Sequence, residues 1–433
     1  MKKLVILLLG FLWILPVQAK TGPDFARFFK DRTLRMDYVH SGTKTTSIYS
    51  LNHFYEEGTW PGNITNLIDT LNLGKYLLRV YDLKTNQLIY SYGYSTLFGE
   101  WQTTDEALEG ISRSFSETVR LPYPKRPVQI TISERDHRNI FHEKFSTVVY
   151  PGSRFISRET RIPADVEVKA LLKSGDPHHK VDIAVISDAY SIQERAKFFS
   201  DAKKRTDVLL NTEPYKSHKN RINVWAIFTP SRESGPDEPR KGIYHNTAIG
   251  TSFNSLDLPR YLMTTDNRAL HDIAAAAPYD NIYILVNSSR YGGGAIYNFY
   301  AVCISNNKWS NYIFVHEFGH AFGGLADEYY SSKVTYNDFY PPGIEPWEPN
   351  ITALLNPKNL KWKDLVTPGT PIPTPPDSAK YGQVVGAFEG AGYVAKGLYR
   401  PTLNSCIMFR KKSKKYCPVC QQAILRVIRF KSE

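Results

Sequence analysis

Cysteine is scarce in this sequence, since only four occur among 433 residues, at Cys303, Cys406, Cys417 and Cys420. So few cysteines in so long a chain exclude a small scaffold that depends on disulfides. Long apolar runs are scarce too: beyond the N-terminal segment, no stretch reaches the roughly 18 apolar residues that a membrane-spanning helix needs. Nucleic-acid-binding motifs and internal repeats are also absent, so no nucleic-acid partner is predicted. A structural Ca²⁺ in the acidic loops stays open, but no EF-hand-like spacing supports it.

The remaining composition is that of an ordinary globular protein, with 42% hydrophobic and 22% charged residues. Aromatic residues make up 13% of the chain, which argues against low-complexity disorder. The length permits two or more domains, each with its own core. The formal net charge of +12 marks a basic protein. Without a nucleic-acid motif, we interpret this charge as a solvated lysine-rich surface.

The first residues, "MKKLVILLLGFLWILPVQA", have the pattern of a signal peptide over residues 1–19. Two lysines precede an apolar run, and the small residue Ala19 provides a cleavage site. A membrane anchor is the alternative, but the run is short for a spanning helix and ends at a processing site. We therefore expect export, with the mature protein in the periplasm, at the cell surface or secreted.

Three of the cysteines lie in one C-terminal stretch, "CIMFRKKSKKYCPVC". In an exported protein, one or two disulfides are plausible there. Cys417 and Cys420 could also form a redox or zinc pair, but a tetrahedral structural zinc site needs a second pair. Only Cys406 and the distant Cys303 remain for that purpose. The sequence therefore favours disulfides or free buried thiols over a second metal.

Residues 20–155 are predicted to form an antiparallel β-sandwich. Two strands flank a turn at residues 84–86, and apolar and polar residues alternate again over residues 126–151. This region shows no cluster of residues suited to chemistry. We interpret His137 and His142 as surface residues.

Residues 156–178 are charged and irregular, and we expect them to link two domains. His178 and His179 lie where this link ends, but adjacent histidines near the start of a strand point apart, which disfavours a metal pair. Residues 179–433 then alternate between strand-like and helix-like segments, which predicts an α/β domain with a mixed sheet.

Within this second domain, we predict strands over 181–190, 222–230 and 281–289 and a helix over 191–211. Ser191 starts that helix, with Glu194 placed to complete a capping box.

Residues 331–400 are rich in proline and are predicted to form a long loop insertion near the functional site.

The stretch "VHEFGHAFGGLADEYY", residues 315–330, carries the clearest chemistry. It is predicted to begin as a helix, and His316 and His320 are four apart, so both project from one face and can bind one Zn²⁺. Glu317 follows His316 and is therefore rotated from it by about 100° around the helix axis. It can therefore stand beside the metal and take a proton from a metal-bound water. Because the HExxH pattern also occurs by chance, it is a weak signal alone.

A catalytic zinc ion needs a third protein ligand. The familiar longer pattern would place that ligand at Ala326, whose side chain cannot coordinate a metal. Gly323 and Gly324 stand where the helix must end and the chain must turn. Asp327 and Glu328 then bring two carboxylates back within reach of the metal.

Two further segments belong with this pattern. "SCIMFR" places Met408 in a short apolar turn, which looks like the methionine turn beneath the metal of metzincin-type zinc proteases. Residues 290–305 contain three glycines followed by a strand pattern. We expect that strand to form the rim of a cleft, with an extended peptide substrate paired along residues 294–304. The alternative is an ordinary core strand with a flexible lead-in.

Together these segments resemble a family. "HEFGHAFGGLADEYY", "GGGAIYNFYAVC", "VGAFEGAGYVAKGLYRP" and "CIMFR…YCPVC" are similar to the secreted bacterial IgA-peptidase family of zinc metallopeptidases, over roughly residues 160–433. The N-terminal β region also looks like that family's leading domain. The HExxHxxxGxxDE spacing is similar, too, to the protease domain of the calcium-activated chloride channel regulators.

The resemblance implies the third ligand. In that pattern, the two histidines and the aspartate of the DE pair bind zinc, which here are His316, His320 and Asp327, and Glu317 is the catalytic glutamate. Glu328 is the second choice as ligand. If Asp327 binds the metal, we expect Glu328 to contact a histidine N–H or the end of the helix.

The predicted function is that of an exported zinc-dependent endopeptidase, with a metal-activated water and Glu317 as general base. A tyrosine could stabilise the oxyanion, but Tyr329, Tyr330, Tyr393 and Tyr399 are not distinguished by sequence. The alternatives are a binding module for a host or surface protein, with a relic or structural metal site, and a self-processing protease. The family name suggests immunoglobulin, but no residue pattern specifies a substrate.

Overall fold

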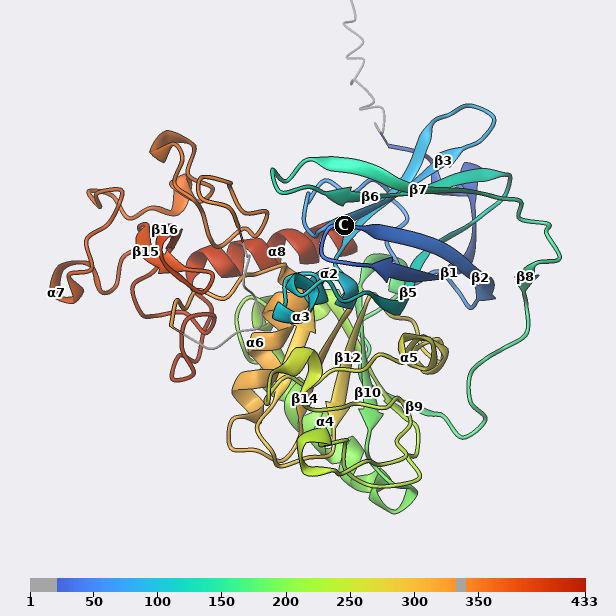
Figure 1. Cartoon of the computed structure of the whole chain (residues 1–433). Helices are drawn as coiled ribbons and strands as arrows, with labels where there is room; N and C mark the ends of the chain where they lie inside the picture. The colour runs from blue at the N-terminus through green and yellow to red at the C-terminus, as the bar shows by residue number, and fades with distance from the viewer. Residues whose placement is uncertain (1–21, 332–339) are drawn as a thin grey trace, which may run out of the picture.

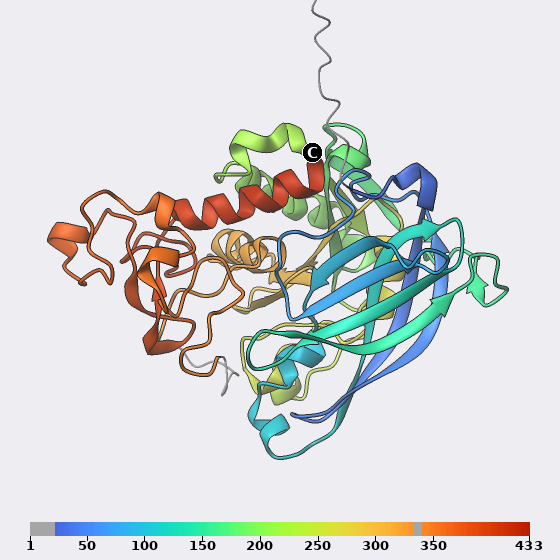
Figure 2. The same cartoon turned by 90° about the horizontal axis from the view of Figure 1, so that it is seen from above.

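The computed structural model describes residues 22–331 and 340–433. The predicted signal peptide, residues 1–19, lies outside the described residues. Figure 1 shows three regions: a β region formed by the N-terminal part, an α/β region below it and a loop-rich region to one side. Helix α8 (Pro418–Ser432) runs from the loop-rich region towards the β region, and Figure 2 shows the same arrangement from above.

Two four-stranded sheets make up most of the N-terminal region, with strand orders β5-β1-β2-β8 and β4-β3-β6-β7. The strands are β1 (Phe29–Gly42), β2 (Ser47–Glu57), β3 (Tyr76–Asp82), β4 (Leu88–Tyr94), β5 (Arg113–Pro124), β6 (Val128–Arg135), β7 (Phe141–Val149) and β8 (Ile156–Ser157). Adjacent strands are antiparallel except for the β2–β8 pair. Buried side chains from both sheets, such as Met36 and Ile130, form one hydrophobic cluster.

The hairpin predicted around residues 84–86 is confirmed, because β3 and β4 pair as antiparallel neighbours. Asn86 adopts a left-handed φ of 56° in the turn, a conformation that asparagine tolerates. His137 and His142 are exposed as predicted. Short helices join these strands, namely α1 (Phe25–Phe28), α2 (Leu97–Trp101) and α3 (Asp105–Leu108).

A six-stranded mixed sheet forms the centre of the α/β region, in the order β13-β14-β12-β10-β11-β9. Its strands are β9 (Glu167–Leu172), β10 (Val181–Asp188), β11 (Ile222–Phe228), β12 (Asn281–Val286), β13 (Gly293–Ile296) and β14 (Tyr300–Ile304). The four central strands are parallel, and the edge strands β9 and β13 are antiparallel to their neighbours. The predicted mixed sheet is thus confirmed.

The expected link over residues 156–178 differs from the structure. Its middle forms β9, which pairs with β11 and closes one edge of the central sheet. Val168 and Leu172 are only partly covered, so this edge strand lacks the continuous apolar run that marks a buried strand. The pairing depends on a neighbour more than fifty residues away, which local composition does not reveal.

The main helices are α4 (Arg195–Leu210), α5 (Asn267–Ala274), α6 (Ser310–Gly323) and α8. The predicted capping box is present, with Ser191 and Glu194 ahead of α4. Single-turn 3₁₀ segments connect these elements, namely η1 (Pro177–His179), η2 (Ile192–Glu194), η3 (Lys216–Arg221), η4 (Pro239–Lys241), η5 (Ser255–Asp257), η6 (Pro357–Asn359) and η7 (Lys363–Leu365).

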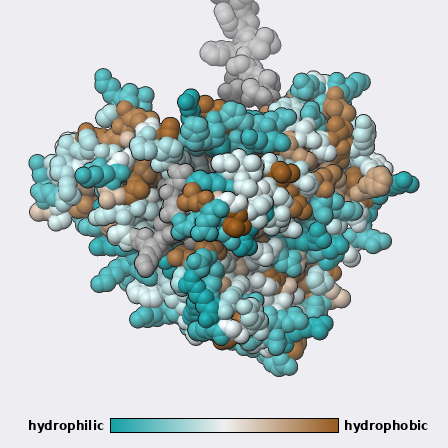
Figure 3. Space-filling model, viewed as in Figure 1, coloured by the Kyte–Doolittle hydropathy of each residue, from teal (hydrophilic) through white to brown (hydrophobic). Residues whose placement is uncertain are grey.

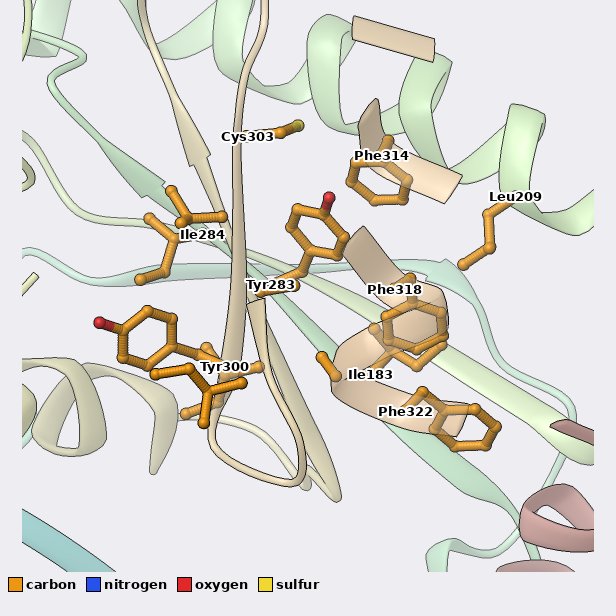
Figure 4. Packing of buried hydrophobic residues seen from close by; sticks show 14 of the residues in the cluster. Ile183, Leu209, Tyr283, Ile284, Tyr300, Cys303, Phe314, Phe318 and Phe322 are labelled. Atoms are coloured by element: carbon orange, nitrogen blue, oxygen red, sulfur yellow. The ribbon is translucent and has the colours of Figure 1, made fainter. Parts of the chain in front are cut away.

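Aromatic stacking fixes α6 against the central sheet (Figure 4). The rings of Tyr283 on β12 and Phe314 on α6 are stacked, with centroids 3.9 Å apart and an interplanar angle of 11°. Phe318 and Phe322 follow on the same side of the helix, and their rings also stack, at 5.1 Å. Ile284 points to the other face of the sheet, as period-two alternation requires. The apolar face of α6 is therefore buried, and its opposite face is available for chemistry.

The proline-rich stretch contains little regular structure in its described part, residues 340–400. It holds α7 (Ser378–Tyr381) and the two-stranded sheet of β15 (Phe388–Ala391) and β16 (Val394–Arg400). A small apolar cluster joins this region to the segment after α6, through Ala326, Ile351 and Leu398. The predicted loop insertion thus packs beside the "HExxH" helix.

Hydrophilic residues cover much of the face seen in Figure 3, and hydrophobic ones occur there in scattered patches. Within the described residues, no helix has both the length and the apolar character needed to cross a membrane.

Candidate metal centre

Helix α6 presents His316 and His320 on the same face, as the spacing predicts. The helix ends where the glycine pair indicates: Gly324 adopts a left-handed φ of 61° and donates its N–H to the His320 carbonyl at 3.1 Å. The next N–H, of Leu325, bonds to the Gly319 carbonyl at 3.2 Å. This termination reverses the chain, so that Asp327 returns to the two histidines.

The three candidate ligand atoms form a nearly regular triangle. The Nε2 atoms of His316 and His320 are 3.3 Å apart. Oδ1 of Asp327 lies 3.1 Å from Nε2 of His316 and 3.4 Å from Nε2 of His320. Ligands bound about 2.0–2.1 Å from a tetrahedral ion would lie roughly 3.3 Å from one another. The triangle therefore fits a metal ion with one further position open.

Backbone carbonyls orient both imidazoles. Nδ1 of His320 lies 2.5 Å from the Leu325 carbonyl oxygen, and Nδ1 of His316 lies 3.2 Å from that of Ile407. A protonated Nδ1 donates to these oxygens and leaves Nε2 with its lone pair towards the centre, the tautomer that a metal ligand requires. Asp327 is oriented in turn by Tyr393, whose hydroxyl donates to Oδ2 at 2.6 Å.

Charge and burial at the triangle also fit a cation. Oδ1 of Asp327 is buried and has no hydrogen-bond partner among the described residues. Burial acts to raise the pKa of Asp327, but the charges of His320 and His316 outweigh it and hold that pKa well below its usual range. Burial also acts to lower the pKa of His320, and the Asp327 carboxylate outweighs it and raises that pKa to about 9. Both shifts show that this position favours a positive charge beside the Asp327 carboxylate, which a bound metal ion would also supply.

Glu317 stands beside the triangle. Its carboxylate belongs to a group with His316 and His320 whose ligand atoms all lie within 4.8 Å of one another. Burial raises the pKa of Glu317, and the two histidines partly oppose that rise. Gly293 on β13 makes room for the carboxylate, since a Cβ at that position would lie 3.3 Å from Oε1 of Glu317.

Met408 lies against the middle turn of α6. A Cβ added to Gly319 would come within 3.0 Å of the Met408 sulfur, so glycine permits this close approach. The carbonyl of Met408 accepts a hydrogen bond from the N–H of Glu328 at 3.0 Å. Met408 therefore contacts both the helix and the segment that carries Asp327.

Of the two contacts expected for Glu328, the one with a histidine N–H is wrong, whereas Glu328 does contact a helix end, through Cys417 and Cys420 at the start of α8. Both Nδ1 atoms are taken by backbone carbonyls, and Glu328 points away from the triangle towards three cysteines. The sequence left disulfides and free buried thiols open, and the second is confirmed: all four cysteines, each within the described part of the chain, are buried free thiols. Cys303 lies apart on β14, while the other three lie around Glu328.

A cavity of about 140 Å³ opens in front of the triangle. Its wall draws on all three regions, including Ser95, Glu100, Arg260, Tyr261, Trp347 and Glu348. Ser95 and Glu100 thus bring the N-terminal region to the cleft, although the sequence of that region shows no cluster of residues suited to chemistry. No local pattern distinguished these residues, because they meet the helix only through tertiary packing.

Of the four tyrosines considered for the oxyanion, Tyr329 and Tyr393 line the cavity. Their rings contact each other edge to face, with centroids 5.5 Å apart. Tyr330 instead packs against Phe409. Tyr399, on β16, pairs through its backbone with Thr352. Of the four tyrosines, only Tyr329 and Tyr393 therefore stay candidates for stabilising the oxyanion.

Residues 290–305 do not form one rim strand. They make a hairpin of β13 and β14, and β14 lies inside the sheet between β13 and β12. Pairing of a substrate along all of 294–304 is therefore excluded. The outer edge of β13 faces the cavity, which Gly293, Gly294 and Ala295 line.

Comparisons with known proteins identify the family of the chain but do not test this geometry. No curated protein matches the chain at a significant level. A solved structure described as "Crystal Structure of a Thermostable Esterase" shows 13% identity and a TM-score of 0.15, over 61% of this chain and 64% of that one, and a likeness this weak carries no argument. The family model for "IgA Peptidase M64" matches residues 169–381 and 376–428, more than half of the chain, and the model for "Peptidase M64 N-terminus" matches residues 24–146. The chain thus belongs to the IgA peptidase M64 family of metallopeptidases.

Proposed function

We propose that the protein is an exported, zinc-dependent endopeptidase. The observation that carries this proposal is the triangle of two imidazole nitrogens and one carboxylate oxygen, 3.1 to 3.4 Å apart, with the orphaned Oδ1 of Asp327 at one corner. Two histidines and a carboxylate are a ligand set that suits catalytic zinc. In this proposal His316, His320 and Asp327 bind the ion.

The chemistry divides among named residues. Zinc, when bound, would supply an acidified water and polarise the scissile carbonyl. Glu317 is placed to take a proton from an attacking water and to pass it to the leaving amine, and burial raises its pKa, which suits the carboxylate to that exchange. Tyr393 holds Asp327 through its 2.6 Å hydrogen bond. Of the four tyrosines considered for the oxyanion, Tyr329 and Tyr393 line the cleft, and Tyr329 is the better candidate because the Tyr393 hydroxyl donates its proton to Asp327.

The edge of β13 is proposed to hold the substrate. Gly293 already pairs through its backbone with residues 260–262. Since residues two apart in a strand direct their backbone groups to the same side, Ala295 offers the next N–H and C=O towards the cleft. An extended peptide can add to this short edge by backbone pairing and place its scissile bond beside Glu317.

Three further expectations stay proposals. We propose that the two N-terminal sheets form a β-sandwich and that the α/β region is metzincin-like, because both sheets share one cluster and Met408 lies against α6. Export rests on the signal-peptide pattern of residues 1–19. The family name suggests immunoglobulin as a substrate, and other proteins are alternatives.

The test is a Glu317→Gln variant of the mature chain. Zinc content and cleavage of unfolded casein, gelatin and immunoglobulins are measured for wild type and variant. We expect the variant to keep its zinc and to lose about 100-fold or more in rate, because general-base catalysis contributes that much. Glu143→Gln, an exposed position on β7, is the matched control and is expected to be as active as wild type.

The same experiment separates the alternatives. A zinc-loaded Glu317→Gln variant that cleaves as fast as wild type would contradict the assignment of Glu317 as general base. Wild type that cleaves no substrate would favour the binding module. A wild-type chain that shortens itself while the variant stays full length would establish self-processing.

A further inference from the structure

A second group of side chains that could bind a metal includes Glu328, the residue next to Asp327 in the sequence. Glu328, Cys406, Cys417 and Cys420 are all buried, and each offers a ligand atom within 4.8 Å of the others. They come from three separate segments: the segment that carries Asp327, the turn of Met408 and the start of α8, where Cys417 is the N-cap. No role in the proposed reaction uses them.

Three of the distances between these atoms are close to those expected in a tetrahedral zinc site, and all four atoms lie within 4.8 Å of one another. The sulfurs of Cys406 and Cys420 are 3.7 Å apart, and Oε1 of Glu328 lies 3.1 Å from the Cys420 sulfur and 3.8 Å from the Cys417 sulfur. Thiolates bound to zinc at about 2.3 Å would lie roughly 3.8 Å from each other, and a carboxylate oxygen would lie slightly closer. A disulfide requires about 2.05 Å between sulfurs, far less than the 3.7 Å found between Cys406 and Cys420.

An independent observation points to a cation there. Glu328 is fully buried, at 0% exposure, and its Oε2 has no hydrogen-bond partner among the described residues. Its Oε1 accepts a hydrogen bond from Asn350 at 3.2 Å. An ionised carboxylate buried with one oxygen unsatisfied is costly unless a positive charge compensates it. A metal ion bound by the carboxylate and the thiols would supply that charge.

The surroundings also suit metal-bound thiolates. The backbone N–H of Cys417 donates to the sulfur of Cys406 at 3.3 Å, an interaction that stabilises a charged sulfur. Cys417 and Cys420 stand at the N-terminus of α8, whose dipole favours negative charge. Buried Arg400 lies near enough for its charge to interact with that of Glu328.

We propose that Glu328, Cys406, Cys417 and Cys420 bind a second, structural zinc ion. Four protein ligands leave no open position, as in structural rather than catalytic zinc sites. Such an ion would tie the segment of Asp327 and the turn of Met408 to α8. It would therefore hold the third ligand of the first site in place without touching the substrate. The sequence argument against a second metal required a second cysteine pair, whereas here Glu328 completes the set.

The test counts metal ions in chains that lack the first site. A His316→Ala/His320→Ala double variant is purified and its zinc is measured by mass spectrometry. We expect it to keep about one zinc ion per chain and to lose it when Cys420→Ala is added. Cys303→Ala, in the same double variant, is the matched control, because Cys303 is equally buried but lies outside the group, and it is expected to leave the zinc in place.

Wild type provides a second measurement in case the Cys420→Ala chain does not fold. After denaturation without reductant and in the presence of a chelator, we expect all four thiols to react with a thiol reagent. Co²⁺ substitution of the double variant should produce a thiolate-to-metal charge-transfer band. Absence of zinc from the folded double variant, or a disulfide among the three cysteines, would overturn the proposal. Loss of peptidase activity in the double variant, with its zinc retained, would reflect the missing first site and would leave the proposal of a second zinc ion in place.

Discussion

Hydrogen bonding orients the Asp327 carboxylate so that one of its oxygens is directed towards the candidate metal position. Its two oxygens have different surroundings, since Oδ1 faces the histidines and Oδ2 accepts the hydrogen bond from Tyr393. Glu328 is the next residue in the sequence, but its side chain contacts Cys417 and Cys420 rather than the histidines. Adjacent residues on an extended segment point in opposite directions, so the DE pair can serve two sites at once.

Tyr393→Phe tests the support of Asp327. The variant removes the 2.6 Å hydrogen bond to Oδ2 and leaves the ring in place. We expect zinc affinity to fall by about 10–100-fold, which is typical when a partner of a metal ligand is lost. Competition with a chelator of known affinity measures this change. Tyr399→Phe is the control, and equal zinc affinity in all three proteins would contradict the assigned role.

Helix α6 is the element on which the site depends. Its apolar face stacks on the central sheet, its polar face carries the histidines, and its end at Gly324 directs the chain back to them. Gly324 has a left-handed φ, and a Cβ there would come within 3.2 Å of Leu73 and 3.3 Å of Trp347. The turn is thus confined by side chains of the other two regions.

Gly324→Ala is expected to lower the free energy of unfolding and the zinc affinity together. The left-handed conformation alone costs about 1–2 kcal/mol for alanine, and crowding adds to this. Gly397→Ala is the matched control, because Gly397 also has a positive φ, of 86°, but no atom lies within 4 Å of its added Cβ. Urea unfolding and zinc titration give the two quantities. Equal loss of zinc affinity in both variants would show that the Gly324 turn has no special role.

At the scale of the whole molecule, the N-terminal region is attached to the catalytic region by buried polar contacts. Arg35 on β1 is 1% exposed and donates to Asp272 on α5 at 2.7 Å. Arg161 reaches the same carboxylate at 3.0 Å. Asn298 and Tyr92 add hydrogen bonds across the same boundary. These contacts join the N-terminal region, which carries Ser95 and Glu100 at the cleft, to the α/β region.

Asp272→Ala is expected to lower the free energy of unfolding by roughly 2–3 kcal/mol, because Arg35 then loses a buried charged hydrogen-bond partner. Asp37 still pairs with the guanidinium at 2.7 Å, which limits the loss. The control is Asp207→Ala, which removes an exposed pair with Lys203 and should change stability by less than about 0.5 kcal/mol. Chemical denaturation measures both. A change at Asp272 as small as that at Asp207 would mean that this contact does not hold the regions together.

The sequence by itself determined the local features. Helical spacing put His316 and His320 on one face, the glycine pair ended the helix, and period-two alternation revealed the hairpin of β3 and β4. These features depend on residues a few positions apart, whose relation is set by backbone geometry. The choice of Asp327 came from resemblance to a family pattern, because spacing alone left Glu328 open.

Only the tertiary structure decided the relations between distant segments. It placed β14 inside the sheet, brought Ser95 and Glu100 to the cleft, and turned Glu328 away from the histidines towards Cys406 and the start of α8. Each of these depends on segments that lie tens to hundreds of residues apart and meet only when the hydrophobic core forms. Local periodicity contains no information about such meetings, so the four residues of the second group became a candidate site only once the chain was folded.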